Sequence, residues 1–480
     1  MLFRILRNVA ALLTGQVLSK IFSLTCIIFL ARRLGVEGFG AYGAIMAYLS
    51  LFTVFADNGL STVTTREIAQ DHACSLTYFS HTVVLRLGMT VWSYGIMLAL
   101  GHFGGILHYP FLFIATCGLF LFPELFHKVG TSMLAGYERM DIIAGLELVS
   151  VIIRYVPFLL AIGLQRSLHW AFSLLVILWF GVAAIWLLVT KHYCLSSRFA
   201  PLRIKTFRTI LYEAFPFGIY FVLSVIYFKA DILMLSGMQG ETAVGFYEGA
   251  YKFIEAAMFI PVSIVNVLLP AMSKSLKTDK NSYANLYVQS TRILAMGILP
   301  VVILISFFAK PIILLVYDAS YLPSALALSL LIWSLFIIFL NAPVGNVIVT
   351  AKLMHRFLPF AVANTVLNII LNLFLIPRYS FLGAAFTTVL TECTGFVLQL
   401  WFAHRAIGNA VQVLEILGKL LIVGAVTSLM CYGLKSLVTL PLTLVLVMGT
   451  YFVCLLAVKL INAEDKNMCL EIFQLVKNKL

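Results

Sequence analysis

The sequence predicts an all-α integral membrane protein with about fourteen transmembrane helices. Hydrophobic residues make up 62% of the 480-residue chain, charged residues make up only 11%, and the mean hydropathy is +1.02. A soluble protein cannot bury so much apolar surface, so most of the chain must be solvated by lipid. The apolar runs are continuous rather than alternating, which favours membrane-crossing helices over a β-barrel.

A basic stretch over residues 191–208 divides these apolar runs into two halves. It is rich in Lys and Arg and contains no acidic residue, and such loops stay in the cytoplasm because positive charge next to a span resists translocation. Six spans are predicted before it, at 9–31, 39–61, 78–100, 109–134, 142–164 and 168–190. Eight follow it, at 213–235, 244–269, 289–309, 324–350, 357–376, 382–403, 414–434 and 440–461.

These spans define the predicted domains. An N-terminal lobe (1–190, spans 1–6) and a C-terminal lobe (213–405, spans 7–12) are joined by a basic cytoplasmic linker (191–212). Residues 406–461 add spans 13 and 14. Residues 462–480 form a cytoplasmic tail, which is either a short amphipathic helix on the membrane surface or a frayed polar end.

The charge distribution predicts that both termini are cytoplasmic. With the N-terminus inside, 22 of the 33 Lys and Arg residues lie in or next to cytoplasmic segments, and six lie outside. Arg4 and Arg7 followed by an apolar run resemble a signal peptide. That run reaches Ala31 without a small-residue cleavage site, so we interpret it as a retained first span. The net charge of +13 fits this positive-inside pattern and anionic lipid, so no nucleic-acid partner is expected.

The motifs of an enzyme or a metal protein are not found in the sequence. The eight Cys residues are scattered without a CxxC or Cys/His spacing, so neither a disulfide framework nor a metal site is indicated. There is no P-loop or nucleophile motif, and the loops are short. We therefore expect no catalytic residues and no cofactor, and a membrane glycosyltransferase, polymerase or ligase is the less favoured alternative.

A short motif occurs at equivalent places in the two halves. Gly40-Ala41-Tyr42 opens the second span of the first half, and Gly245-Phe246-Tyr247 opens the second span of the second half. Each follows a turn that is predicted to lie outside the membrane. The pair suggests an internal repeat, as in many transporters.

Several charged residues lie within or near the predicted spans. An intramembrane charge costs at least ~2.5–3.5 kcal/mol, so each should face a partner or a wet cavity. Glu248, Lys252 and Glu255 share one face of span eight, and they form either a self-neutralising ion pair or a polar cavity surface. Arg154 lies in mid-span, which favours a cavity, whereas Arg86 could also snorkel towards the cytoplasm. The basic candidates are Lys20, Arg86, Arg154, Lys229 and Lys252.

Four segments resemble one transporter family. Residues 29–42 (FLARRLGVEGFGAY) are similar to the R-LG-x-x-x-(F/Y)G-x-Y opening of the bacterial polysaccharide-repeat-unit (O-antigen, Wzx-type) flippases. Asp57-Asn58-Gly59-Leu60 with Thr65–Ala69 resembles their D-x-G-L…REIA segment. Leu269–Ser273 fits their LP-x-x-S. Asn364, Asn368, Pro377 and Gly383–Ala385, with Glu392, resemble N-x-x-x-N…IP…GAA…T…E.

The resemblance implies a fold and a substrate. The family belongs to the multidrug/oligosaccharidyl-lipid/polysaccharide (MOP) exporter superfamily, whose MATE-like fold pairs two six-helix lobes around a cavity that works by alternating access. Spans 13 and 14 are extra. The implied substrate is an undecaprenyl-diphosphate-linked oligosaccharide, moved across the bacterial cytoplasmic (inner) membrane for O-antigen, lipopolysaccharide or other surface polysaccharide. An ion-coupled multidrug antiporter and a peptidoglycan lipid II flippase are the alternatives.

Under this resemblance the charged residues receive roles. The five cations would bind the diphosphate, because crossing hydrocarbon requires donors and positive charge around it. A proton or sodium gradient would supply the energy, through one of Asp57, Glu124, Asp231 or Glu392. Glu248 and Glu255 would add a polar cavity face. The expected partners are the lipid-linked substrate, membrane lipids and other polysaccharide-assembly membrane proteins.

Overall fold

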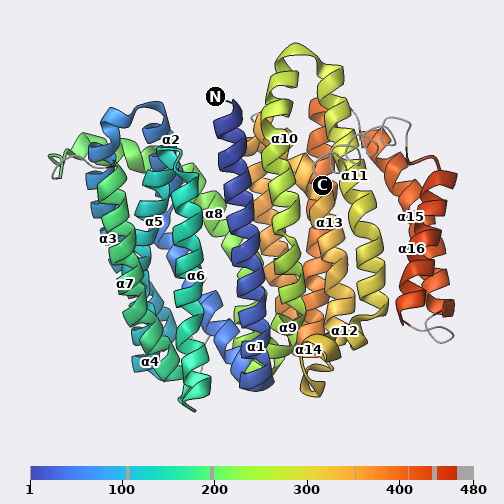
Figure 1. Cartoon of the computed structure of the whole chain (residues 1–480), viewed down its shortest axis with the longest axis horizontal. Coiled ribbons are helices and arrows are strands. Elements are labelled where there is room, and N and C mark those ends of the chain that lie inside the picture. Colours follow the sequence, from blue (N-terminus) through green and yellow to red (C-terminus); the bar gives the residue numbers. More distant parts are fainter. Residues whose placement is uncertain are drawn as a thin grey trace. The chain divides into compact units, whose positions relative to one another are not determined.

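The protein is all-helical, as predicted. A computed structural model describes residues 2–103, 109–194, 199–351, 353–408, 410–434 and 440–461, and these residues form helices and no strand (Figure 1). In these ranges, ten helical segments are long and apolar enough to cross a membrane. The prediction of an all-α membrane protein is confirmed.

The chain forms two compact units. The first comprises Met1–Lys252, Val316–Pro323 and Thr365–Thr387, and the second comprises Phe253–Leu315, Ser324–Asn364 and Thr388–Leu480. The first unit therefore extends beyond the linker predicted at 191–212 and takes in the following span. The division into six-helix lobes at 1–190 and 213–405 stays a prediction.

The first unit contains the helices of the N-terminal half. The helices begin and end as follows: α1 (Leu2–Asp57), α2 (Leu60–Gln70), α3 (Ser75–Phe103), α4 (Phe111–Gly118), α5 (Leu121–Gly136), α6 (Met140–Gly163), α7 (Leu168–Cys194), α8 (Ile204–Gln239) and most of α9 (Glu241–Ala257). The short 3₁₀ helices are His72–Cys74 and Ala319–Tyr321. Helix α5 lies at the centre of this unit, because α1, α2, α3, α6 and α7 all pack against it.

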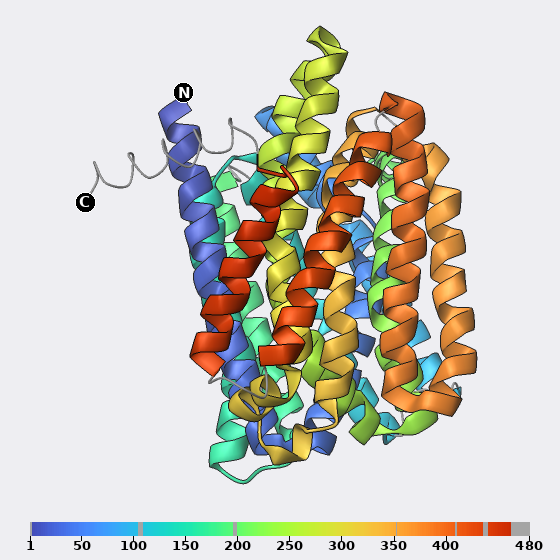
Figure 2. The ribbon, with the colours of Figure 1, turned by 90° about the vertical axis from the view of Figure 1, so that its right-hand side faces the viewer.

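The second unit contains most of the remaining helices. They are α10 (Phe259–Thr278), α11 (Lys280–Phe307), α12 (Ala309–Val316), α13 (Ser324–Thr350), most of α14 (Met354–Ile407), α15 (Ala410–Leu434) and α16 (Leu440–Ala457). Helices α15 and α16, the predicted spans 13 and 14, lie side by side and pack on α11 (Figure 2). The Tyr451 hydroxyl of α16 donates to the Met296 carbonyl at 2.6 Å, which ties this helix pair to its own unit.

Two of the long helices each contain two predicted spans. The helical path of α1 is broken at Gly35 (φ 68°), between the predicted spans 9–31 and 39–61. The path of α14 is broken at Ser380 (φ 50°), between 357–376 and 382–403. Conversely, span four is divided into α4 and α5, and span eight into α9 and α10. The fourteen predicted spans are thus roughly consistent with the helices.

The glycines of the repeated motif meet at one helix crossing. A Cβ atom at Gly40 would overlap the Glu241 carbonyl oxygen, and a Cβ at Gly245 would overlap the Val36 carbonyl oxygen. Each glycine therefore packs against the residue four positions before the other glycine. Only glycine permits this backbone approach, so the two motifs form a locally two-fold contact between α1 and α9.

The end of the basic linker is fixed to α3. The backbone amide of Ala200 donates to Ser80 Oγ at 2.8 Å, and that of Arg203 donates to His81 Nε2 at 3.0 Å. These bonds hold the start of α8 next to α3 within the first unit. Residues 195–198 of the linker and the predicted tail at 462–480 lie outside the described residues.

Candidate functional site

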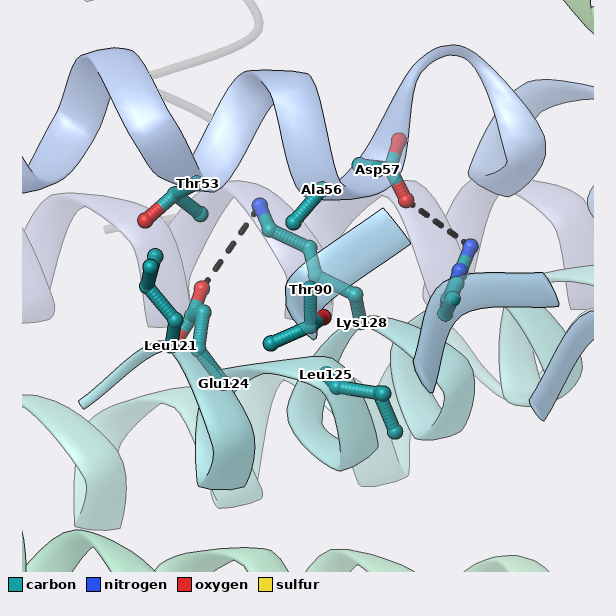
Figure 3. A pocket seen from close by; sticks show the side chains of 9 residues that line it. Thr53, Ala56, Asp57, Thr90, Leu121, Glu124, Leu125 and Lys128 are labelled. Atoms are coloured by element: carbon teal, nitrogen blue, oxygen red, sulfur yellow. Dashed lines mark ion pairs between the residues drawn. The ribbon is translucent and has the colours of Figure 1, made fainter. Parts of the chain in front are cut away.

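A polar pocket lies inside the first unit. Its cavity volume is about 10 Å³, room for about one water molecule, and α1, α3 and α5 line it (Figure 3). Four of its lining residues carry charge, and they form two ion pairs. The lining residues are Thr53, Ala56, Asp57, Arg86, Thr90, Leu121, Glu124, Leu125 and Lys128.

Asp57 and Arg86 form the first of these ion pairs. An Arg86 Nη2 atom lies 2.9 Å from Asp57 Oδ1, and the Arg86 side chain is only 1% exposed. The same Nη2 donates to Ser61 Oγ, which in turn donates to Asp57 Oδ1. Arg86 is therefore enclosed by protein and does not snorkel. Two residues that the sequence analysis assigned to different roles neutralise each other.

Glu124 belongs to the second ion pair and to a larger cluster. Its carboxylate lies 3.9 Å from Lys128 Nζ, and the two side chains point towards each other in Figure 3. It also lies 3.5 Å from His127 Nδ1 and accepts a 2.9 Å hydrogen bond from the Trp179 indole. Glu124 is buried, so these contacts compensate for the lost hydration of its charge.

The cluster continues from α5 to α6 and α7. His127 Nε2 lies 3.2 Å from Glu147 Oε1, and the His127 ring meets the Trp186 ring edge-on at 4.8 Å. The Arg154 guanidinium lies over the Trp179 ring at 4.9 Å. Glu147 and Arg154, which share a face of α6, are thus connected through His127 and Trp179 rather than paired directly.

Sequence reasoning missed His127, Trp179 and Trp186. Tryptophans are common at membrane interfaces, the nine histidines are dispersed along the sequence, and these three residues stand in no known motif. Two spacings could have revealed them. His127 follows Glu124 by three positions, and Trp179 and Trp186 lie seven positions apart, so both pairs share a helix face.

Two buried tyrosines, Tyr42 and Tyr155, lie within electrostatic range of both Arg154 and Lys252. Both cations interact electrostatically with the Tyr42 and Tyr155 side chains, which are 5% exposed each. Tyr155 also shares a 2.7 Å hydrogen bond with Ser23. Two positive charges from α6 and α9 therefore act on one group of hydroxyls inside the first unit.

The two cations differ in their own partners. Lys252 Nζ lies 2.6 Å from Glu248, so the self-neutralising pair considered for this helix face is present. Arg154 has no carboxylate within ion-pair distance in the described part of the chain, and its Nε is buried without a hydrogen-bond partner there. Arg154 is therefore the cation best able to accept an anion.

The other predicted residues lie elsewhere. Asp231 is buried, and its carboxylate accepts hydrogen bonds from Tyr247 and Asn372, both at 2.7 Å. Lys229 lies 5.8 Å from the centre of the Tyr251 ring. Lys20 is exposed on α1, and all of these residues belong to the first unit.

Two predicted acids belong to the second unit. Glu392 is buried and accepts a 3.4 Å hydrogen bond from Asn341, and Glu255 follows Lys252 on α9. The structure thus places the predicted residues in several groups. Asp57 and Arg86 lie together, and so do Glu248 and Lys252. Glu124 lies near Arg154, whereas Asp231 has separate partners.

Two family models match the chain. The model described as "Polysaccharide biosynthesis protein" matches residues 5–276, and the model described as "Lipid II flippase MurJ" matches residues 148–453. The first match includes the pocket residues, His127, Arg154 and Lys252.

Three curated archaeal proteins are similar in sequence. A probable low-salt glycan biosynthesis flippase, Agl15 of Haloferax volcanii, is 22% identical over 438 residues, which is 89% of each chain. The probable flippase AglR of the same organism is 29% identical over 38% of each chain. An uncharacterized membrane protein of Methanocaldococcus jannaschii, MJ1068, is 24% identical over 43% of this chain and 42% of its own length. The alignments thus span less than half of AglR and MJ1068.

Solved transporters share the fold. The lipid II flippase MurJ in an inward closed conformation superposes with a TM-score of 0.76 at 15% identity, over 93% of this chain and 97% of that one. An inward-facing MATE family multidrug resistance transporter of the MOP superfamily gives a TM-score of 0.66 at 15% identity, over 81% and 95%. The match over residues 5–276 covers more than half of the chain, and the helical fold is consistent with it. This chain belongs to the polysaccharide biosynthesis protein family, a flippase family of the MOP superfamily.

Proposed function

We propose that this protein is a flippase that moves a lipid-diphosphate-linked oligosaccharide from the cytoplasmic to the outer leaflet by alternating access. The observation that carries the proposal is Arg154, a partly buried cation without a carboxylate partner in the described part of the chain, which acts electrostatically on the same two tyrosines as Lys252. A diphosphate would supply the direct anionic partner that the Arg154 guanidinium does not have among the described residues, where Glu124 and Glu147 act on it only from beyond ion-pair distance. A guanidinium binds it through two parallel hydrogen bonds, and an ammonium adds a point charge.

The family matches support a glycan lipid as the cargo. One family model is described as a polysaccharide biosynthesis protein and the other as a lipid II flippase, and Agl15 is named as a probable glycan biosynthesis flippase. We propose undecaprenyl diphosphate as the carrier, an O-antigen or other surface polysaccharide as the product, and the bacterial cytoplasmic membrane as the location. Polysaccharide-assembly membrane proteins would load and use the cargo. The protein would transport it without altering a covalent bond, so it would not act as an enzyme.

A second candidate cargo is the peptidoglycan precursor lipid II. It is favoured by one observation, the match of residues 148–453 to the lipid II flippase family model. Both cargoes carry a diphosphate, so the Arg154 site serves either one. The two are separated by their sugars, and competition between the two lipids in one transport assay distinguishes them.

The transport needs an energy source. We propose that a proton or sodium gradient drives it through a buried acid, with Asp57, Glu124, Asp231 and Glu392 as the candidates. Asp57 is the least suited of these, because it is already neutralised by Arg86 at 2.9 Å. Transport that persists unchanged after both gradients are collapsed would reject gradient coupling.

The proposal is tested with the purified protein in liposomes. The probe is fluorescent undecaprenyl-diphosphate-linked oligosaccharide, and its movement between leaflets is read by quenching from one side. Arg154→Ala should slow transport by about tenfold to a hundredfold, since each lost charge-assisted bond is worth ~1.5–3 kcal/mol. Arg154→Lys should recover part of the rate, because the planar fork is lost but the charge remains.

The control is Arg166→Ala. Arg166 is exposed just beyond α6, so this change removes an equal charge away from the pocket. It should transport at the parental rate. If Arg154→Ala is present at normal abundance and fully active, Arg154 does not bind the cargo.

A further inference from the structure

The side chains of Glu124, His127 and Glu147 are placed so that they can share one bound proton. His127 Nδ1 faces Glu124 at 3.5 Å, and Nε2 faces Glu147 at 3.2 Å. A neutral imidazole carries a proton on only one ring nitrogen, so the other would turn a lone pair towards a carboxylate oxygen. Both contacts are favourable only when the imidazole is doubly protonated or when one carboxyl group holds the extra proton.

The arrangement does not suit a metal ion. The two carboxylates approach opposite nitrogens of one ring, so the three groups do not converge on a common point as the ligands of a metal do. A proton requires no such convergence. Neither ring nitrogen has hydrogen-bond geometry in the described part of the chain, so a small ring rotation can make or break the contacts, which are ion pairs only when His127 is protonated.

The surrounding charges leave the site balanced without that proton. Lys128 on α5 and Arg154 on α6 offset the two carboxylates, whereas α7 contributes only the indoles of Trp179 and Trp186. Asp57 on α1 pairs with Arg86 on α3. On α2, Arg66 pairs with Glu67 and with Glu213 of α8. Binding one proton thus adds one positive charge to the site.

The site reaches the protein surface at Glu147 and is connected to Arg154 through Trp179. Glu147 is 37% exposed, so a proton can enter or leave at this carboxylate, whereas Glu124 is buried beside a pocket that holds about one water molecule. Trp179 donates its indole N–H to Glu124, and its ring lies under the Arg154 guanidinium. A shift of Glu124 on proton release therefore moves the ring that supports Arg154.

We propose that Glu124, His127 and Glu147 form a proton-binding site that is coupled through Trp179 to the anion site at Arg154. One proton enters from solvent and occupies the site, and the same proton leaves when the His127 contacts break. This inference rests on the proposed function only for the second role, the coupling to transport. Proton binding itself can be measured without any cargo.

Trp179 and Trp186 provide the probe for proton binding. Their rings lie 5.9 and 4.8 Å from the His127 ring, and an imidazolium beside an indole changes the fluorescence of the indole. The other four tryptophans are replaced by Phe, and the protein in nanodiscs is titrated from about pH 5 to about pH 9. The replaced residues are Trp92, Trp170, Trp333 and Trp401.

The titration is expected to show one transition that depends on His127. His127→Gln should abolish it. His169→Gln is the matched control and should retain it, because His169 lies on the same helix as both tryptophans but stacks on Phe113. Glu147→Gln should move the midpoint to lower pH, because the imidazolium loses one anionic partner. If His127→Gln does not fold, Glu147→Gln carries the same test. The proposal is overturned if the parental protein shows no fluorescence transition. It is also overturned if the transition is still present in His127→Gln.

The coupling to transport is tested in the liposome assay with the same undecaprenyl-diphosphate-linked probe. The transport rate of the parental protein should change when a pH gradient is imposed. The rate of His127→Gln should be the same with and without the gradient. A gradient response equal to that of the parent would overturn the coupling. If the parental protein does not move the probe at all, the proposed function is wrong. The fluorescence titration then still shows whether the proton-binding site exists.

Discussion

Arg86 and Asp57 form an ion pair within the first unit, at 2.9 Å and with 1% of the Arg86 side chain exposed. A guanidinium in this position has lost its hydration, and the carboxylate and Ser61 are the groups that replace it. The pair joins the end of α1 to α3 beside the pocket. It therefore contributes to the geometry of the pocket whether or not either residue contacts a cargo.

Removing one partner of this pair should destabilise the protein strongly. Asp57→Asn leaves a buried, unpaired guanidinium, which costs about 3–5 kcal/mol. We expect a lower melting temperature in detergent and reduced abundance in the membrane. Combining it with Arg86→Met removes the stranded charge and should restore most of the stability. A double variant as unstable as Asp57→Asn alone would contradict a structural role for the pair.

Trp179→Phe should separate the two contacts of this indole. The change keeps an aromatic ring under Arg154 but removes the N–H that donates to Glu124 at 2.9 Å. Glu124 then loses a buried hydrogen bond, which costs about 1–3 kcal/mol in the free energy of unfolding. The control is Trp92→Phe, at an exposed position on α3, with an expected change within about 0.5 kcal/mol. Equal effects of the two substitutions would argue against the importance of the Glu124 bond.

The glycine crossing between α1 and α9 should not tolerate a methyl group. Gly40→Ala and Gly245→Ala each place a Cβ on a carbonyl oxygen of the other helix, and overpacking of this kind costs about 1–3 kcal/mol. Gly95→Ala on α3 is the control, because its Cβ meets open space and alanine favours the helix. Thermal unfolding in detergent measures all three. If Gly40→Ala has the same melting temperature as Gly95→Ala, the two helices are not packed as closely at this crossing as the structure indicates.

Reporter fusions test the predicted orientation. Fusions at Ser197 in the basic linker and at Asn478 in the tail should both give cytoplasmic signals, because 22 of the 33 Lys and Arg residues lie on that side in this topology. An alkaline phosphatase fusion and a fluorescent protein fusion at each position report opposite sides. An external signal at either position refutes an arrangement with both ends inside.

The sequence by itself determined the fold class. Long apolar runs can satisfy their backbone hydrogen bonds in lipid only as helices, so run length and composition predict membrane spans before any packing is known. The family also followed from the sequence, because motifs such as residues 29–42 and Asp57–Leu60 are local. The spacing of Gly40 and Gly245 indicated a repeat, but not that the two glycines pack against each other.

Only the tertiary structure decided which charges pair. Glu124 and Glu147 lie on different helices, and the sequence offered no reason to place one histidine between them. Asp57 and Arg86 are 29 positions apart and were assigned separate roles. Whether an intramembrane charge is neutralised depends on which helix faces it are brought together, and this is set by packing around α5 rather than by any local pattern.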